Sequence, residues 1–325
     1  MEQLQNDARE HILTDGFAED EFSVVIVPDT QILAAKHPAH FRTMAQWIAK
    51  NADRLKVKMI LHEGDVVHNG EKDENQFRLA REAFDLFDAA GIPYLIAPGN
   101  HDYDNMLKID RSLTMFNKYF GADRYRAKPW FGGTFEEGKA ENSYAKLDIA
   151  GRKWLFLALE FGPRDEALAW ADEVLRSNAD HTAIIVTHTY MYMFGERTKP
   201  GDDHNPKIYP GATGANDGED VWQKSLKAHR NLLAVFSGHH VEENVSYRLD
   251  LGQHGNPVFQ AFLNWQCKEE GGQGRFGILK VRPAANELRL YVLNPVSDKF
   301  EAEPGYEAVV PLAPQSAATG LRFPK

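Results

Sequence analysis

Five short polar clusters carry the residue types that bind metal ions and transfer protons. In chain order they are Asp29 with Gln31, Asp65, Asn100 with His101, His188, and His239 with His240. Carboxylate, amide and imidazole ligands suit ions such as Mn, Fe and Zn, and they suit soft metals poorly. A carboxylate shared by two such ions would hold them about 3.5 to 4 Å apart, where a bridging hydroxide attacks a phosphoryl or acyl centre. The clusters therefore indicate metal-assisted hydrolysis.

Each cluster taken alone is weak evidence for a site. In Gly99-Asn100-His101-Asp102, for example, the amide and the carboxylate could satisfy turn hydrogen bonds while the imidazole is solvated. The site interpretation gains weight because every cluster follows an apolar run with the length and composition of a buried strand. These runs are residues 22–27, 58–61, 94–97, 182–186 and 232–236.

Helical periodicity lies between the first three of these strands. Apolar residues recur at three- and four-residue spacing from Phe41 to Leu55 and from Phe77 to Phe87, which places them on one face of each helix. Alternating strands and helices predict right-handed crossovers and a parallel core. Because such folds gather polar residues at the carboxyl ends of the strands, we expect the five clusters to meet at one edge of a sheet.

The remaining patterns are less regular. Further helices are predicted within residues 106–119, 165–177 and 221–230, and a hairpin over residues 144–159. Residues 190–220 predict a long loop over the site, in which Tyr190, Tyr192, Phe194 and Arg197 either line a substrate pocket or form a solvated surface. In the first case Arg197 would bind phosphate. Short apolar runs at residues 244–249, 258–263, 276–281 and 288–293 predict a second, antiparallel sheet.

Composition excludes several classes of protein. The net charge of −10 argues against a nucleic-acid binder that works by counterion release. No apolar run approaches the roughly 20 residues that cross a membrane, and the polar N-terminus does not resemble a secretory signal, so we expect a cytoplasmic protein. The single cysteine, Cys267, excludes a disulfide within the chain. We expect an N-terminal extension over residues 1–20, one domain over 21–300 and a C-terminal tail over 301–325.

At these motifs the sequence resembles the calcineurin-like metallophosphoesterase superfamily. The family pattern DxH, GDxxD, GNHD/E, a lone histidine and GHxH is matched in order by residues 29–31, 64–68, 99–102, 188 and 238–240. The resemblance implies a four-layer α/β/β/α sandwich, with two mixed β-sheets packed face to face and flanked by helices. It also implies two divalent metal ions, chosen from Mn, Fe, Zn and Mg, and a small-molecule phosphoester substrate. A hydroxide bridging the ions would be the nucleophile of a phosphomonoesterase or phosphodiesterase.

The resemblance also implies residue roles. Asp65 would bridge the two metals, and Asp29 would hold the first of them. Three residues would complete the second-metal site: Asn100, His188 and His239. His101 would lie beside the metals and protonate the leaving-group oxygen, and Asp102 would orient that imidazole and raise its pKa. Asn264 and Gln266 resemble polar residues found near the site in this family.

Three positions depart from the family pattern. Gln31 stands for the histidine of DxH, His68 for the second aspartate of GDxxD and Val241 for the last histidine of GHxH. The first and third changes weaken the first-metal site. Gln31 can still offer a carbonyl oxygen, which favours Mn or Mg over Zn, unless it points away and hydrogen-bonds the loop. His240 is a further candidate ligand, although adjacent strand residues point to opposite faces.

These departures leave alternatives open. The fold could serve as a catalytically weak scaffold that binds a protein partner, or as a mononuclear hydrolase of another bond type. Retention of His101 favours a phosphoesterase, because a scaffold has no use for an imidazole that does not bind metal.

Overall fold

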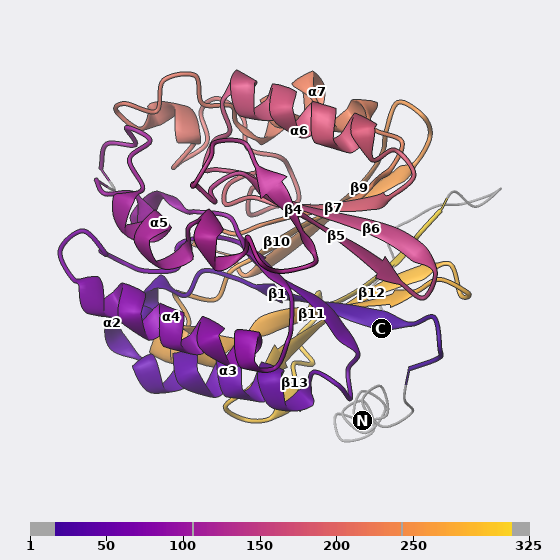
Figure 1. Cartoon of the computed structure of the whole chain (residues 1–325), viewed down its shortest axis with the longest axis horizontal. Coiled ribbons are helices and arrows are strands. Elements are labelled where there is room, and N and C mark those ends of the chain that lie inside the picture. The colour runs from indigo at the N-terminus through magenta and orange to yellow at the C-terminus, as the bar shows by residue number, and fades with distance from the viewer. Residues whose placement is uncertain (1–16, 106, 242, 314–325) are drawn as a thin grey trace.

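The computed structural model describes residues 17–313 except 106 and 242, and it shows two seven-stranded sheets packed face to face (Figure 1). Helices cover the outer face of each sheet, which confirms the predicted four-layer sandwich of two mixed sheets. The apolar runs form strands because they can be buried on both faces. All six residues of β1 (Phe22–Val27), for example, are buried.

The first sheet has the strand order β13-β12-β11-β1-β2-β3, and β14 pairs with β12. Its other strands are β2 (Val57–His62), β3 (Tyr94–Ile96), β11 (Phe276–Arg282), β12 (Glu287–Asn294), β13 (Lys299–Phe300) and β14 (Glu307–Pro311). Strands β1, β2 and β3 are parallel, as predicted, whereas β11 runs antiparallel to β1.

The second sheet has the strand order β4-β5-β6-β7-β8-β10-β9. Its strands are β4 (Phe131–Thr134), β5 (Ser143–Ile149), β6 (Arg152–Ala158), β7 (Thr182–Val186), β8 (Leu232–Ser237), β9 (Val245–Leu251) and β10 (Pro257–Leu263). Strands β6, β7, β8 and β10 are parallel, and the hairpin of β5 and β6 is the predicted one.

The prediction that the last four apolar runs form a separate antiparallel sheet is wrong. Strands β9 and β10 extend the second sheet, with β10 parallel to β8, whereas β11 and β12 extend the first sheet beyond β1. The five polar clusters therefore follow strands of both sheets rather than of one. They can still meet, because the two sheets pack face to face.

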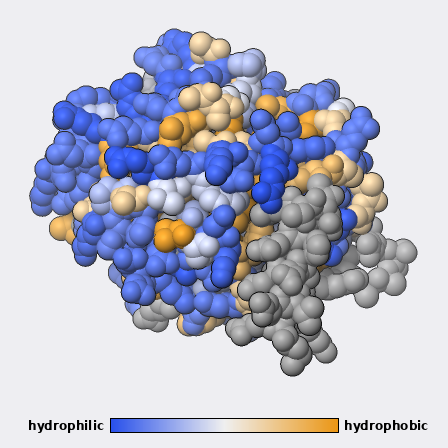
Figure 2. Space-filling view, turned by 90° about the horizontal axis from the view of Figure 1, so that it is seen from below, coloured by the Kyte–Doolittle hydropathy of each residue, from blue (hydrophilic) through white to orange (hydrophobic). Residues whose placement is uncertain are grey.

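The helices fall into two layers (Figure 1). Their bounds are α2 (Gln31–Lys36), α3 (Pro38–Asn51), α4 (Glu74–Ala89), α5 (Thr114–Phe120), α6 (Asp165–Ser177) and α7 (Gly218–Lys224). Helices α2 to α4 cover the first sheet, and α6 and α7 cover the second. The apolar stripe of α3 packs inward through Phe41, Met44 and Ile48, as predicted. Figure 2 shows the outer face on the side of the first sheet, where hydrophilic residues predominate.

The helix predicted within residues 106–119 begins only at Thr114. The carboxylate of Asp104 accepts hydrogen bonds from the backbone N–H groups of Thr114 and Met115, at 2.9 and 3.2 Å. These bonds satisfy donors that have no partner inside the first turn, so the helix begins there.

The two predicted ends of the chain are described only in part. Residues 1–16 and 314–325 lie outside the described residues, and with them most of the expected extension and tail. Strand β14 falls within the expected tail, and its pairing with β12 makes it part of the first sheet. Among the described residues, no helix has the length and apolar character needed to cross a membrane.

Candidate metal centre

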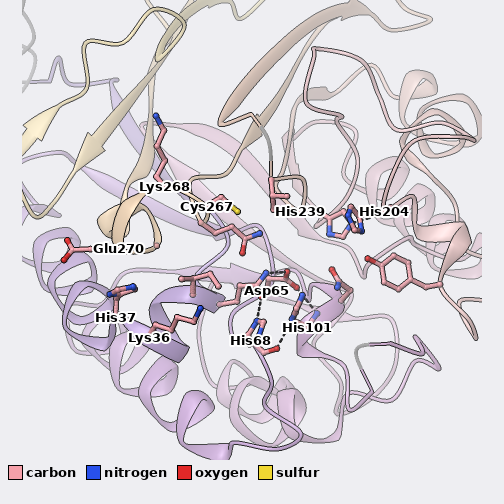
Figure 3. Close-up of a pocket in the computed structure, with 17 residues that line it drawn as sticks. Lys36, His37, Asp65, His68, His101, His204, His239, Cys267, Lys268 and Glu270 are labelled. Atoms are coloured by element: carbon pink, nitrogen blue, oxygen red, sulfur yellow. Dashed lines mark hydrogen bonds between the residues drawn. The ribbon is translucent and has the colours of Figure 1, made fainter.

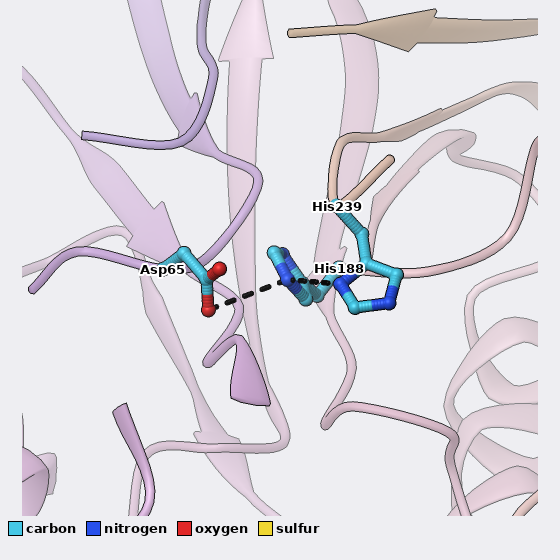
Figure 4. A group of neighbouring side chains, drawn as sticks. All are labelled: Asp65, His188 and His239. Atoms are coloured by element: carbon cyan, nitrogen blue, oxygen red, sulfur yellow. Dashed lines mark hydrogen bonds and ion pairs between the residues drawn. The ribbon is translucent and has the colours of Figure 1, made fainter. Parts of the chain in front are cut away.

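The residues after β2, β7 and β8 meet in one buried group. Ligand atoms of Asp65, His188 and His239 all lie within 4.8 Å of one another, and all three side chains are buried (Figure 4). The structure thus brings together clusters that follow strands of different sheets.

Backbone carbonyl groups fix which nitrogen of each imidazole faces this group. Nδ1 of His188 lies 2.8 Å from the carbonyl oxygen of Glu63, and Nε2 of His239 lies 2.9 Å from that of His204. A carbonyl only accepts, so these two nitrogens carry the protons. Nε2 of His188 and Nδ1 of His239 are therefore left with lone pairs, and they lie 3.0 Å apart.

Two oxygens complete the convergence of lone pairs. Nε2 of His188 lies 3.2 Å from Oδ1 of Asn100 and 3.3 Å from Oδ1 of Asp65. Buried acceptors this close repel one another unless a cation lies between them. Two imidazole nitrogens, a carboxylate oxygen and an amide oxygen form a set that fits Mn, Fe or Zn. The second-metal residues predicted from the sequence therefore fit a divalent ion.

The charges around His188 favour a cation as well. Burial lowers the pKa of His188, but the charges of Asp65 and Asp29 more than offset burial and raise it to about 9. Burial and the charge of His188 lower the pKa of His239 well below its ordinary value. The carboxylates around the group thus favour positive charge where the lone pairs converge.

Asp29, after β1, has a different environment. Its Oδ2 accepts hydrogen bonds from the side-chain amides of Asn264, at 2.9 Å, and Gln266, at 3.3 Å. Both carboxylate oxygens also lie 3.3 Å from the backbone N–H of His239. Burial raises the pKa of Asp29 to about 8, with the charge of His188 lowering it and that of Asp65 raising it. Asn264 and Gln266 thus lie beside Asp29, the residue that the resemblance leads us to expect at the first metal.

Gln31 lies within the site, where it lines the pocket and bonds to both Asp65 and the loop residue His68. Its Nε2 donates to Oδ2 of Asp65 at 2.7 Å, and its Oε1 lies 2.8 Å from Nδ1 of His68. In this orientation the amide carbonyl accepts a hydrogen bond from His68, and the amide nitrogen occupies one oxygen of the carboxylate. Gln31 and His68, two of the three residues that depart from the family pattern, are therefore hydrogen-bonded to each other.

His240 does not join the ligand group. Its ring packs against Tyr192, with ring centroids 4.6 Å apart, and against Phe262 at 6.3 Å. Burial lowers its pKa to about 3, and its Nε2 has no hydrogen-bond partner among the described residues. Its ring also contacts that of His239, with ring centroids 4.9 Å apart, and both residues follow the end of β8, so the alternation of strand side chains does not apply to them.

His101 is held by the backbone on one side and faces the pocket on the other. Its Nδ1 donates to the carbonyl oxygen of His68 at 2.8 Å, and its backbone N–H donates to Oδ1 of Asp65 at 2.9 Å. The imidazole also stacks on that of His68, with ring centroids 4.9 Å apart. Nε2 remains for a substrate, because Nδ1 is occupied.

The prediction that Asp102 orients His101 is wrong. The carboxylate accepts from the backbone N–H groups of Val66 at 3.2 Å, Val67 at 3.1 Å and Gly99 at 2.8 Å. It thereby ties the loop after β2 to the loop after β3. Burial and the charge of Asp65 raise the pKa of Asp102 to about 7, although these N–H groups lower it.

Two glycines allow these loops to approach each other. Gly64 has a φ of +104°, and a Cβ there would lie 2.6 Å from Nδ1 of His188. A Cβ on Gly99 would lie 2.1 Å from Oδ1 of Asp65. Any side chain at either position would displace a residue of the ligand group, which explains why both motifs require glycine.

A pocket of about 510 Å³ opens above this group (Figure 3). Asp65, Asn100, His101 and His239 line it together with Lys36, Tyr209 and Lys268. His37 and His204 also line it. No sequence pattern distinguished these residues, because a loop and a short helix bring them to the pocket.

Arg197 is neither a phosphate ligand nor a solvated residue. Its side chain is buried and bonds to Glu219 at 2.8 Å, Asp250 at 2.5 Å and Gln260 at 2.8 Å. The guanidinium also lies over the ring of Trp222, 4.7 Å from its centroid. Arg197 therefore anchors the loop after β7 to the second sheet.

Comparison with known proteins agrees with this geometry. The family model of the calcineurin-like phosphoesterases matches residues 22–243. An uncharacterized protein of Bacillus subtilis, YvnB, is 30% identical over 287 residues, which cover 87% of this chain and 20% of YvnB. The chain thus spans about a fifth of the length of that relative.

Solved structures show the same fold at low sequence identity. Purple acid phosphatase PPD1 from yellow lupin superposes with a TM-score of 0.54 at 14% identity, covering 87% of this chain and 53% of that one. A dimetal phosphatase from Danio rerio superposes with a TM-score of 0.52 at 10% identity, covering 90% and 99%. The family model matches more than half of the residues and includes all the polar clusters, so the chain belongs to the calcineurin-like phosphoesterase family.

Proposed function

We propose that this protein hydrolyses small-molecule phosphoesters with two divalent metal ions bound at the junction of the two sheets. The observation that carries the proposal is the convergence of four lone pairs, from Asp65, Asn100, His188 and His239, beside an imidazole that faces the pocket. Bound divalent ions would supply Lewis acidity to the phosphoryl group and to the attacking water.

The ligand assignment follows from the contacts. Asn100, His188 and His239 would hold the second ion, and Asp29 with Gln31 would help to hold the first. Asp65 lies between these sets, because its Oδ1 is near His188 and its Oδ2 is near Gln31. A carboxylate with one oxygen toward each set is suited to bridge two ions.

His101 would act as the general acid. Its Nδ1 proton is held by the carbonyl of His68, so Nε2 is the atom that would donate a proton to the leaving-group oxygen. Stacking on His68 and the backbone bond to Asp65 fix the position of the ring.

The test is turnover of p-nitrophenyl phosphate and bis(p-nitrophenyl) phosphate, which represent monoesters and diesters. A chelator should abolish turnover, and Mn²⁺ or a similar ion should restore it. Turnover by a preparation shown to be free of metal would contradict the proposal. The ratio of the two rates would decide between a phosphomonoesterase and a phosphodiesterase.

The scaffold alternative predicts a different result. A scaffold would bind metal through Asp65, His188 and His239 yet show no turnover with any of a panel of divalent ions. The side chain of His101 favours the enzyme, because its imidazole is held by the carbonyl of His68 and not by a proposed metal ligand. Only the backbone N–H of His101 contacts such a ligand, Oδ1 of Asp65.

A further inference from the structure

We propose that Lys36 binds a second anionic group of the substrate, so that the natural substrate is a phosphoester carrying another phosphate or a carboxylate. This inference rests on the proposed function and specifies its substrate class. Lys36 is the last residue of α2, the helix that begins at Gln31, and it lines the same pocket as Asp65 and His101. One short helix therefore connects the first-metal site to this cation.

The pocket is larger than a phosphoryl group requires. A volume of about 510 Å³ lies in the range that buries most of a drug-sized ligand. The scissile phosphate would occupy the part beside Asp65 and His101, and the rest of the substrate would occupy the remainder.

Of the two lysines that line the pocket, Lys36 is the better placed to bind the part of a substrate beyond the scissile phosphate. Only two lysines and no arginine line the pocket among the described residues. Lys268 lies 3.6 Å from the carboxylate of Glu303, and Figure 3 shows its ammonium directed away from Asp65. The ammonium of Lys36 is directed toward the Asp65 side, and it has no hydrogen-bond or ion-pair partner in the described part of the chain.

Negative charge elsewhere makes a local cation important. The chain carries a net charge of −10, which disfavours the approach of an anionic substrate. Besides Asp65, Glu270 is the carboxylate among the described residues that line the pocket, and it is engaged by His40 at 3.1 Å and by Gln273 at 3.0 Å. Lys36 therefore remains available to a ligand.

An unusual turn fixes the end of α2 at the rim. Residues Glu270, Gly271, Gly272 and Gln273 all have φ between 52° and 77°, so four consecutive residues are left-handed. A Cβ on Gly271 would lie 2.9 Å from Cγ2 of Ile32, which shows how closely the turn packs on the helix. A left-handed backbone is costly for Glu270 and Gln273, because neither residue is glycine, so the surrounding packing must hold this turn in place. The turn thus packs against α2, the helix whose last residue is Lys36.

The test compares matched substrates by release of inorganic phosphate. Fructose 1,6-bisphosphate against fructose 6-phosphate tests a second phosphate, and 3-phosphoglycerate against glycerol 3-phosphate tests a carboxylate. We expect kcat/KM to be about tenfold higher for the doubly anionic member of at least one pair, the typical worth of a charge-assisted hydrogen bond. The pair that shows the preference identifies the second group.

The decisive variant is Lys36→Gln, with Lys50→Gln as its matched control. Lys50 lies in the last turn of α3 as Lys36 lies in the last turn of α2, it is exposed, and it does not line the pocket, so both variants change the net charge equally. Lys36→Gln should remove the preference, because kcat/KM falls far more for the doubly anionic substrate than for p-nitrophenyl phosphate, whereas Lys50→Gln should keep the preference. Absence of any preference in the wild type, or an equal loss on all substrates in Lys36→Gln, would overturn the inference.

Failure of the proposed function would be seen separately, as absence of p-nitrophenyl phosphate turnover with every metal. In that case the inference is tested by calorimetric binding of fructose 1,6-bisphosphate to the Mn²⁺-loaded protein. Binding about tenfold weaker in Lys36→Gln than in Lys50→Gln would support it. Equal binding by the two variants, or none by the wild type, would overturn it.

Discussion

The two halves of the metal centre use similar residue types in opposite ways. Around His188, the proton-bearing nitrogens are bonded outward to backbone carbonyls, and only lone pairs face inward. Around Asp29, N–H groups of Asn264, Gln266 and the backbone already donate to the carboxylate. The first arrangement is satisfied only by a cation, whereas the second is partly satisfied without one. We therefore expect the second-metal site to bind its ion tightly and the first-metal site to bind more loosely.

The largest expected effect is that of replacing His101, which tests whether this residue is a general acid or a metal ligand. His101→Ala should lower the rate roughly 100- to 10,000-fold, the usual contribution of a general acid, and leave metal content unchanged. Metal analysis alongside kinetics checks this. A variant that loses metal would show that His101 is a ligand of the second site.

The pH dependence of stability should distinguish the metal-free from the metal-loaded centre. Folding raises the pKa of Asp29 to about 8 and of His188 to about 9. In the metal-free protein the folded state thus binds more protons than the unfolded state between about pH 7 and 9. Stability should fall as pH rises through this window, by up to about 1.4 kcal/mol per pH unit for each such group.

Bound ions should flatten that slope, because they replace the protons that Asp29 and His188 retain. Urea unfolding at pH 7 and pH 9, with and without Mn²⁺, measures both slopes. Equal slopes in the two forms would mean that no cation site includes these groups.

A variant of Asp102 tests whether its carboxylate stabilises the two loops or orients the imidazole of His101. Asp102→Asn places an amide N–H against backbone N–H groups, so we expect a loss of about 1 to 3 kcal/mol in the free energy of unfolding. The pH profile of turnover should keep its shape, since Asp102 does not contact His101. A shifted profile without a loss of stability would restore the orienting role that the sequence suggested.

Gln31→His should give the smallest effect, and it tests the proposed first-metal site directly. An imidazole is a better donor than an amide oxygen to borderline metals, so the affinity of the loose site should rise for Zn or Fe, by about tenfold, and rise less for Mn or Mg. Calorimetric titration with each ion checks this. Unchanged affinity for every ion would remove Gln31 from the ligand set.

The sequence predicted most of what positions the centre. Apolar runs alone located β1, β2, β3, β7 and β8, and polar residues that follow these strands form the candidate metal centre. Periodicity is a local property, however, and it could not tell that β10 pairs with β8 while β11 pairs with β1. Partner choice depends on contacts between residues far apart in the chain.

Side-chain roles were harder to predict for the same reason. Asp102 is adjacent to His101 in sequence, but its three donors come from two loops, and nothing in the sequence marked their N–H groups as unpaired. Arg197 could have faced substrate, yet Glu219, Asp250 and Gln260 surround it from distant positions. The left-handed turn over residues 270–273 was not predicted either, since two of its four residues are not glycine.

Metal titration of the metal-free protein tests the difference between the two halves most directly. We predict one tight Mn²⁺ ion per chain and a second bound at least about tenfold more weakly, with His239→Ala losing the tight ion and Asp29→Ala losing the weak one. Two ions of equal affinity, or a tight ion that survives in His239→Ala and disappears in Asp29→Ala, would contradict it.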